Sequence, residues 1–343
     1  MNGYSFFAPI KVLFGAGKLG ELGAQKLPGT KALIVTTGGN SVKRFGYLQR
    51  VEAELDRAGM AYELFDRIEP NPLRETVNAG GWMARTHGCD FVLALGGGSV
   101  MDGSKGICAV AANPHTDAEG NECPGDIWDF VNGGTALGVT TTAGTGSEVD
   151  AGGVLSCEDN DEKLRLGDPR LFPVLSIVDP ALMVSVPARL TAYQGFDALF
   201  HCVECYISNT NTPMGDMVCR EGIRRAAAAL PACVNNGDDL EARSSLAFAN
   251  TLGGYAMDAS GTTGSHGLEH GTASDPHDFV VELTCLMEAC HVADLAMSEW
   301  GITDKELPTI AHNALTTNGV LFSHDPVTLT EPDVVEILKN SYR

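Results

Sequence analysis

The chain has 343 residues, 44% of them hydrophobic and 20% charged, which is typical of a folded protein long enough for two domains. Its 44 acidic residues against 23 basic ones give a net charge of −21, which excludes nucleic acid and anionic membrane surfaces as expected partners. No apolar run reaches the length of about 18 residues that a transmembrane helix needs. We therefore expect neither nucleic acid nor a membrane as a partner.

The cysteines and the N-terminus indicate in which cellular compartment the protein is found. The chain has ten cysteines, several inside apolar stretches, such as Cys108 and Cys285. This pattern favours reduced, partly buried thiols over a disulfide framework. The N-terminus has no basic region ahead of its apolar residues, so it is a poor signal peptide and a plausible first strand. We expect a cytoplasmic protein.

The first half of the chain alternates between strand and helix patterns. Short runs, of which 31–37 is both apolar and β-branched, predict strands at 31–37, 61–65, 91–95, 137–142, 154–156 and 174–178. Helical spacing predicts helices at 41–59, 75–87 and 100–111. This order predicts βαβ units and a parallel sheet with helices on both faces.

Two small-residue loops follow predicted strands. The strand at 91–95 runs into a turn of three glycines and a serine, Gly96-Gly97-Gly98-Ser99, and a helix follows this turn. Glycines let a phosphate approach the backbone, and free N–H groups at a helix start attract an anion. The alternative is a turn without a ligand, although three consecutive glycines exceed what a turn needs. The second loop, 141–148, is rich in hydroxyls that suit a ribose, a phosphate or a nicotinamide amide.

After Pro187 the strand patterns fade and helical ones replace them. Helices are predicted at 192–208, 215–229, 240–253, 283–296, 305–316 and 332–342. We expect an α/β nucleotide-binding domain at 1–186 and a helical domain at 187–343.

Two pairs of metal-capable side chains lie in helical stretches, four residues apart. Asp197 precedes His201, and His266 precedes His270. Residues i and i+4 share one face of a helix, so the pairs can converge on one cation. A carboxylate and imidazole set suits a first-row metal better than Mg²⁺ or Ca²⁺. Each pair alone also arises by chance.

Four motifs carry a family resemblance. FVLALGGGSVMDGSKG at 91–106, TTTAGTGSEV at 140–149, GFDALFHCVECYIS at 195–208 and SHGLEH at 265–270 occur in this order. Together they resemble the iron-containing (group III) alcohol dehydrogenases, particularly the butanol-dehydrogenase-like branch. The resemblance implies a Rossmann-like α/β domain followed by an all-helical, dehydroquinate-synthase-like domain. It also implies reversible hydride transfer between NADP(H) or NAD(H) and a primary alcohol or aldehyde, in a homo-oligomer.

The resemblance assigns roles residue by residue. The residues implied to bind the nucleotide are Gly38, Gly39, Asn40, Ser41, Asn71, Gly97, Gly98, Ser99, Asp102, Thr141, Thr142 and Thr145. Those implied to bind a divalent metal, Fe²⁺ first and Zn²⁺ as the alternative, are Asp197, His201 and His266. The resemblance makes His270 the proton relay, and the alternative is a group that orients another ligand. The turn at 38–41 has no acidic residue, and Lys43 and Arg44 follow it, so we expect NADP(H).

The chain departs from the family pattern after His270. The family's fourth metal ligand, in a Pro-His-Gly segment, is absent, and the chain from Asp275 resembles a later part of the family sequence. We infer an internal shortening near 271–275, which would expose apolar faces of the remaining helices; His277 is a possible substitute ligand. Two rival interpretations follow: a catalytically impaired family member that still binds nucleotide, and a polyol or glycerol dehydrogenase of the same fold.

Overall fold

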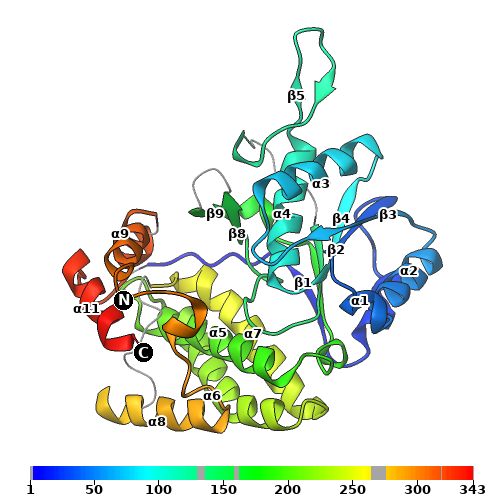
Figure 1. Ribbon diagram of the computed structural model, residues 1–343. Coiled ribbons are helices and arrows are strands. Elements are labelled where there is room, and N and C mark those ends of the chain that lie inside the picture. The colour runs from blue at the N-terminus through cyan, green and yellow to red at the C-terminus, as the bar shows by residue number, and fades with distance from the viewer. Residues whose placement is uncertain (1–2, 130–135, 158–161, 264–275, 318, 343) are drawn as a thin grey trace.

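A computed structural model describes residues 3–129, 136–157, 162–263, 276–317 and 319–342. It places an α/β layer beside a set of packed helices, and these helices come from the second half of the chain (Figure 1). The predicted fold class is confirmed: a parallel sheet with helices, followed by a helical region.

The central sheet is six-stranded and parallel, in the order β1-β10-β7-β4-β2-β3. Its strands are β1 Lys11–Phe14, β2 Lys31–Thr37, β3 Ala61–Ile68, β4 Phe91–Gly96, β7 Ala136–Thr140 and β10 Leu175–Val178. Every residue of β4 is buried, because helices cover the sheet on both sides. Alternate residues of β2 enter different cores: Leu33 packs with one cluster and Ile34 with the other.

The helices of this domain divide between those two cores. Helices α3 (Arg74–Thr86) and α4 (Gly98–Ala112) pack on one face, whereas α2 (Tyr47–Arg57) packs on the other. The single helix predicted at 41–59 is wrong. It is divided into α1 (Ser41–Arg44) and α2 because Gly46, with φ 73°, turns the chain between them.

Two antiparallel hairpins extend from the α/β domain. One pairs β8 (Gly152–Cys157) with β9 (Glu162–Gly167), and β9 was not predicted. The other pairs β5 (His115–Thr116) with β6 (Glu122–Cys123) and projects from the body of the molecule (Figure 1).

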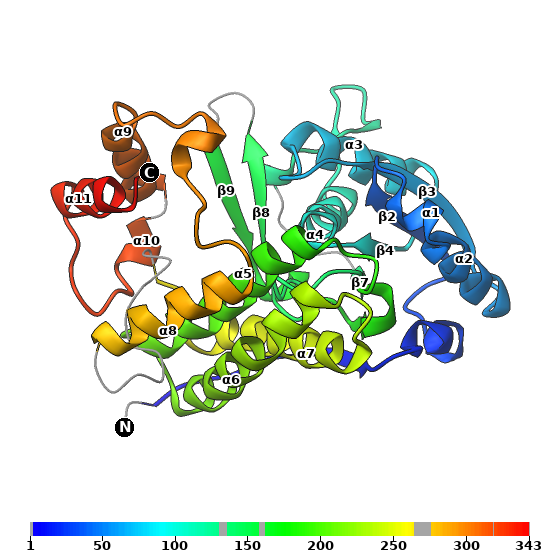
Figure 2. The same ribbon diagram turned by 60° about the horizontal axis from the view of Figure 1, so that its bottom comes forward.

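The helical part is built on three long helices, α5 (Ala188–Ile207), α6 (Pro213–Asn235) and α7 (Leu240–Ser260), which share one apolar core (Figure 2). Side-chain caps fix two of their starts: Thr212 accepts from the Gly215 N–H, and Asp239 accepts from the Ala242 N–H. The remaining helices are α8 Pro276–Ala289, α9 Leu307–Thr317, α10 Gly319–Phe322 and α11 Glu331–Ser341.

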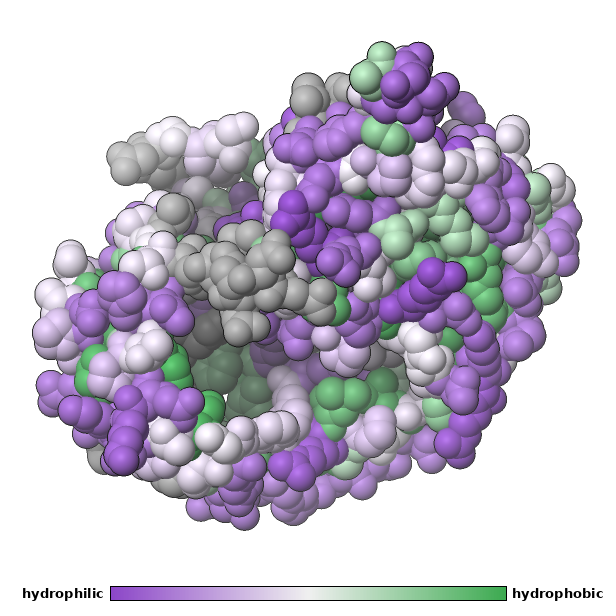
Figure 3. All heavy atoms as spheres, turned by 45° about the horizontal axis from the view of Figure 1, so that its top comes forward, coloured by the Kyte–Doolittle hydropathy of each residue, from purple (hydrophilic) through white to green (hydrophobic). Residues whose placement is uncertain are grey.

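Helix α8 lies seven residues earlier than the predicted helix at 283–296. It ends at Ala289 because the chain turns at His291, whose φ is 58°. Val280 and Val281 of this helix are 47% and 46% exposed. Figure 3 shows a hollow in one face of the molecule, with hydrophobic residues inside it. Among the helices in the described ranges, none has the length and apolar character needed to cross a bilayer.

Candidate functional site

The glycine-rich turn joins β4 to α4 and packs against the second loop. A Cβ added to Gly97 would lie 2.7 Å from the Thr142 hydroxyl oxygen, and one added to Gly98 would collide with Thr145. Only glycine fits this close approach. The structure therefore brings together the two loops that the sequence singled out separately.

Asn71 joins this turn from a third segment. Its backbone has φ 57°, in the left-handed region that asparagine tolerates, and its N–H donates to the Ser99 hydroxyl oxygen at 3.3 Å. The start of α4, with its free N–H groups, thus lies beside residues from the ends of β3, β4 and β7. This is the carboxyl edge of a parallel sheet, where nucleotides bind in open α/β folds.

The Asp102 carboxylate, also assigned to the nucleotide, is held by the protein itself. It accepts from the Ser147 hydroxyl at 2.6 Å and from the Val154 N–H at 2.9 Å. Burial raises the pKa of Asp102 to about 6, against the opposing effect of the Lys105 ammonium. Asp102 therefore fixes the 147–154 segment to α4.

A buried lysine completes this network. The Lys105 side chain is 1% exposed, and its ammonium donates to Ser147 Oγ (2.8 Å), Asp150 Oδ1 (2.7 Å) and the Gly152 carbonyl (2.6 Å). Lys105 was not predicted as a functional residue. Its position one helical turn after Asp102 was the available signal.

The turn at 38–41 lies at the end of β2, next to the end of β3. Lys43 follows it, and the Lys43 ammonium pairs with the Asp66 carboxylate at 2.5 Å. The Lys43 ammonium lowers the pKa of Asp66. Arg44 instead lies over the Phe45 ring, 5.6 Å from its centroid. The turn is thus less cationic than its own sequence indicates, because Asp66 comes from the neighbouring strand.

The candidate metal ligands Asp197 and His201 lie one turn apart on α5, with His201 Nε2 3.6 Å from Asp197 Oδ1. His201 Nδ1 faces the Gly144 carbonyl oxygen at 3.3 Å. A proton on Nδ1 leaves the Nε2 lone pair free on the side of the carboxylate. Two donors each about 2.1 Å from one ion lie about 3.0–3.5 Å apart, so this pair at 3.6 Å is slightly wider than a bound first-row cation requires.

His266 and His270 lie outside the described residues, and so does the side chain of His277 at the start of α8. Within the described ranges, no three histidine, cysteine or acidic side chains gather closely enough to hold a metal. The structure therefore supplies two of the three implied ligands.

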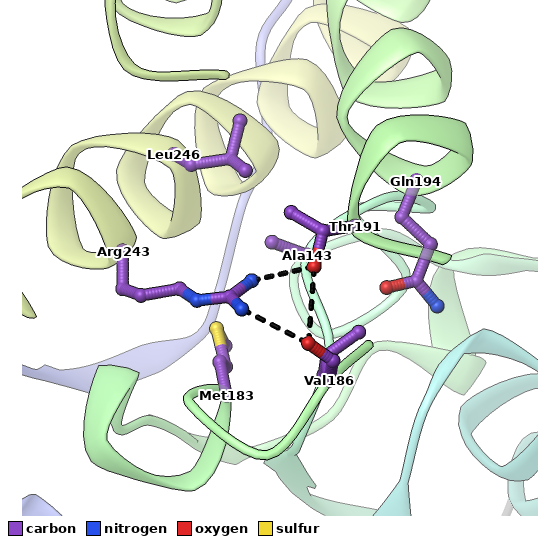
Figure 4. A pocket seen from close by; sticks show the side chains of 7 residues that line it. All are labelled: Ala143, Met183, Val186, Thr191, Gln194, Arg243 and Leu246. Atoms are coloured by element: carbon purple, nitrogen blue, oxygen red, sulfur yellow. Dashed lines mark hydrogen bonds between the residues drawn. The ribbon is translucent and has the colours of Figure 1, made fainter. Parts of the chain in front are cut away.

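A small cavity adjoins the loop at 141–145. Figure 4 shows its lining, which consists of Ala143, Met183, Val186, Thr191, Gln194, Arg243 and Leu246. The Arg243 guanidinium is buried and donates to Thr191 Oγ1 at 2.8 Å and to the Val186 carbonyl at 3.0 Å. Arg243 thus ties α7 to the start of α5 at the junction between the lobes.

Two family models match the chain. Residues 9–180 match the iron-containing alcohol dehydrogenase model, and residues 191–277 match the model for the C-terminal part of the Fe-containing alcohol dehydrogenase family. The chain is 32% identical over 288 residues to a probable NADH-dependent butanol dehydrogenase of Bacillus subtilis, covering 80% of this chain and 71% of that protein.

Two further comparisons extend over nearly the whole chain. A solved archaeal alcohol dehydrogenase from a Red Sea brine pool superposes with a TM-score of 0.89 at 28% identity, covering 99% of this chain and 100% of the other. The NAD-dependent methanol dehydrogenase of Bacillus methanolicus is 28% identical, covering 98% of this chain and 99% of that protein. This alignment spans 388 positions, whereas the chain has 343 residues, so at least 45 positions have no counterpart here.

Proposed function

Because this chain belongs to the iron-containing alcohol dehydrogenases, we propose that it transfers hydride between NADPH and an aldehyde, and in reverse between NADP⁺ and a primary alcohol. One observation carries the proposal. The loop at 141–145 packs Thr142 and Thr145 against the glycine-rich turn and faces His201 with its Gly144 carbonyl. This one loop therefore contacts both the glycine-rich turn and the helix that carries the two metal-capable side chains.

In this proposal the start of α4 holds the pyrophosphate. The backbone N–H groups of Gly97, Gly98 and Ser99 are the donors, and the two glycines let the turn pack closely against Thr142 and Thr145. Asn71 supports Ser99 from the β3 side. Thr141, Thr142 and Thr145 line the nicotinamide end, where their loop approaches α5.

The metal site takes Asp197 and His201 from α5, with His266 as the third proposed ligand. When bound, a divalent cation such as Fe²⁺ or Zn²⁺ supplies Lewis acidity to the substrate oxygen. The Gly144 carbonyl fixes the His201 ring so that Nε2 faces the site. His270 is proposed to carry the proton to or from the substrate oxygen, a role that suits imidazole near neutral pH.

Titration of NADPH against the purified protein, followed by nucleotide fluorescence, tests the cradle. Metal analysis and butanal reduction, for the wild type beside His201→Ala, test the metal site. We expect the variant to bind NADPH as the wild type does but to lose metal and activity. If the wild type does not perturb NADPH fluorescence, the nucleotide proposal is wrong.

The second candidate function is that of an impaired member that binds nucleotide without turnover. At least 45 positions of the methanol dehydrogenase alignment have no counterpart in this chain, which favours it. Wild-type protein that binds NADPH but neither retains Fe²⁺ or Zn²⁺ nor reduces butanal with added metal would establish this function.

The preference for NADPH rests on the 38–41 turn, which lacks an acidic side chain that would repel a 2′-phosphate. Lys43 supplies the cation, although Asp66 shares it. We further infer a cytoplasmic location, because all ten cysteines are free thiols and most of them are buried. A homo-oligomer is inferred from the family resemblance alone.

A further inference from the structure

The segment 144–150 connects the candidate metal helix to the candidate nucleotide turn. At one end the Gly144 carbonyl faces His201 Nδ1 at 3.3 Å. Further along, the Ser147 hydroxyl donates to Asp102 at 2.6 Å. The position of this one segment therefore sets the orientation of both a candidate ligand and a group on α4.

A buried carboxyl group, Glu148, holds the segment to α7. The residue is 1% exposed, and its Oε1 accepts from Asn250 Nδ2 and from Thr251 Oγ1, both at 2.9 Å. Asn250 also accepts from the Gly146 N–H at 2.8 Å through its own Oδ1. Asn250 of α7 is thus hydrogen-bonded to the segment at two points, the Gly146 N–H and the Glu148 carboxyl group.

The backbones themselves also touch here. A Cβ added to Gly146 would lie 2.6 Å from the Gly254 nitrogen, and one added to Gly254 would collide with the Gly146 carbonyl. The Ser176 hydroxyl of β10 donates to the Glu148 carbonyl at 2.5 Å. The segment is therefore fixed to the sheet on one side and to α7 on the other.

We propose that Glu148 is a positioning residue for the metal site. By anchoring the segment to α7, it holds the Gly144 carbonyl where that oxygen orients the His201 imidazole. This role rests on the proposed function, because it concerns the same metal ligand. Both donors to Oε1 are neutral, so the site needs an acceptor oxygen at this distance rather than a negative charge.

Co²⁺ binding, followed by visible absorbance, tests the role in Glu148→Ala and Glu148→Gln, alongside NADPH binding. Groups that orient a metal-bound histidine typically contribute about 10- to 100-fold in metal affinity. We expect Glu148→Ala to weaken Co²⁺ binding by about that factor and Glu148→Gln, which keeps Oε1, to stay within about threefold of wild type. If Glu148→Ala does not fold, Thr251→Val tests the positioning role instead. It removes one of the two donors to Oε1 and should weaken Co²⁺ binding about threefold to tenfold.

Val51→Ala is the control for general destabilisation, since Val51 is fully buried in α2, on the sheet face opposite α3 and α4. It should lower the melting temperature yet leave Co²⁺ affinity unchanged. Unchanged Co²⁺ affinity in Glu148→Ala, or an equal loss in Val51→Ala, refutes the positioning role. A Glu148→Gln variant as weak as Glu148→Ala refutes it too. Wild-type protein that binds neither Co²⁺ nor NADPH refutes the proposed function, and the positioning role with it.

Discussion

Replacing Lys105 with methionine should destabilise the protein strongly. The ammonium is 1% exposed and donates to three acceptors, one of them the Asp150 carboxylate at 2.7 Å. Methionine fills a similar volume but leaves Asp150 buried without its cation. Breaking a buried ion pair from one side costs about 3–5 kcal/mol. For domains of this size that corresponds to a fall in melting temperature of roughly 6–20 °C.

Thermal unfolding of the apo protein, followed by far-ultraviolet circular dichroism, measures this effect. Two further variants separate the buried charge from the loss of any lysine. The double variant Lys105→Met/Asp150→Asn removes the orphaned charge and should recover most of the loss. Lys18→Met breaks the exposed pair with Glu21, which is worth about 0–1 kcal/mol, so it should leave the melting temperature nearly unchanged. A fall of less than about 3 °C in Lys105→Met, or no recovery in the double variant, would refute the reasoning.

Three further outcomes are expected. Asp66→Asn frees the exposed Lys43 ammonium, and a surface ion pair is worth about 0–1 kcal/mol, so the ratio of kcat/KM for NADPH to that for NADH should rise by up to about fivefold. Lys43→Met should lower this ratio, and an unchanged ratio in both variants would contradict the reasoning. Burial raises the pKa of Glu148 from 4.5 to about 7, so the stabilisation from its protonated form is complete below about pH 4.5 and is lost as pH rises through 7. We expect the free energy of unfolding to fall between pH 5 and pH 8 by up to about 3 kcal/mol less in Glu148→Gln than in the wild type, as measured by chemical denaturation. Gly98→Ala collides with Thr145, so NADPH binding should weaken about tenfold while the far-ultraviolet circular dichroism spectrum stays that of the wild type, and unchanged NADPH affinity would contradict this.

Local pattern was sufficient for much of the fold. The strand at 91–95 and the helix after it carry their own signals, a short apolar run and a glycine-rich start, and the structure has both. The break at Gly46 was missed because the apolar spacing continues through it, although the backbone does not. The position of α8 was missed because helical periodicity fits several registers of an apolar stretch.

The site shows what a single sequence leaves out. The turn at 38–41 is cationic when only its neighbours along the chain are considered, yet Asp66 of the adjacent strand pairs with Lys43. The contact of Glu148 with Asn250 joins residues 102 positions apart, and the 140–149 motif that contains Glu148 does not indicate its partner on α7. Long-range pairs of this kind depend on the topology, and local periodicity carries no information about them.

The contact between Gly146 and Gly254 limits how this protein can diverge. In an ordinary core, a larger side chain can be accommodated by a smaller one opposite, so two changes together preserve the packing. Here the atoms that meet are peptide groups, which no substitution can shorten. A first change at either position has no compensating change at the other. Laboratory evolution toward new substrates should therefore leave both glycines untouched while the surrounding side chains vary.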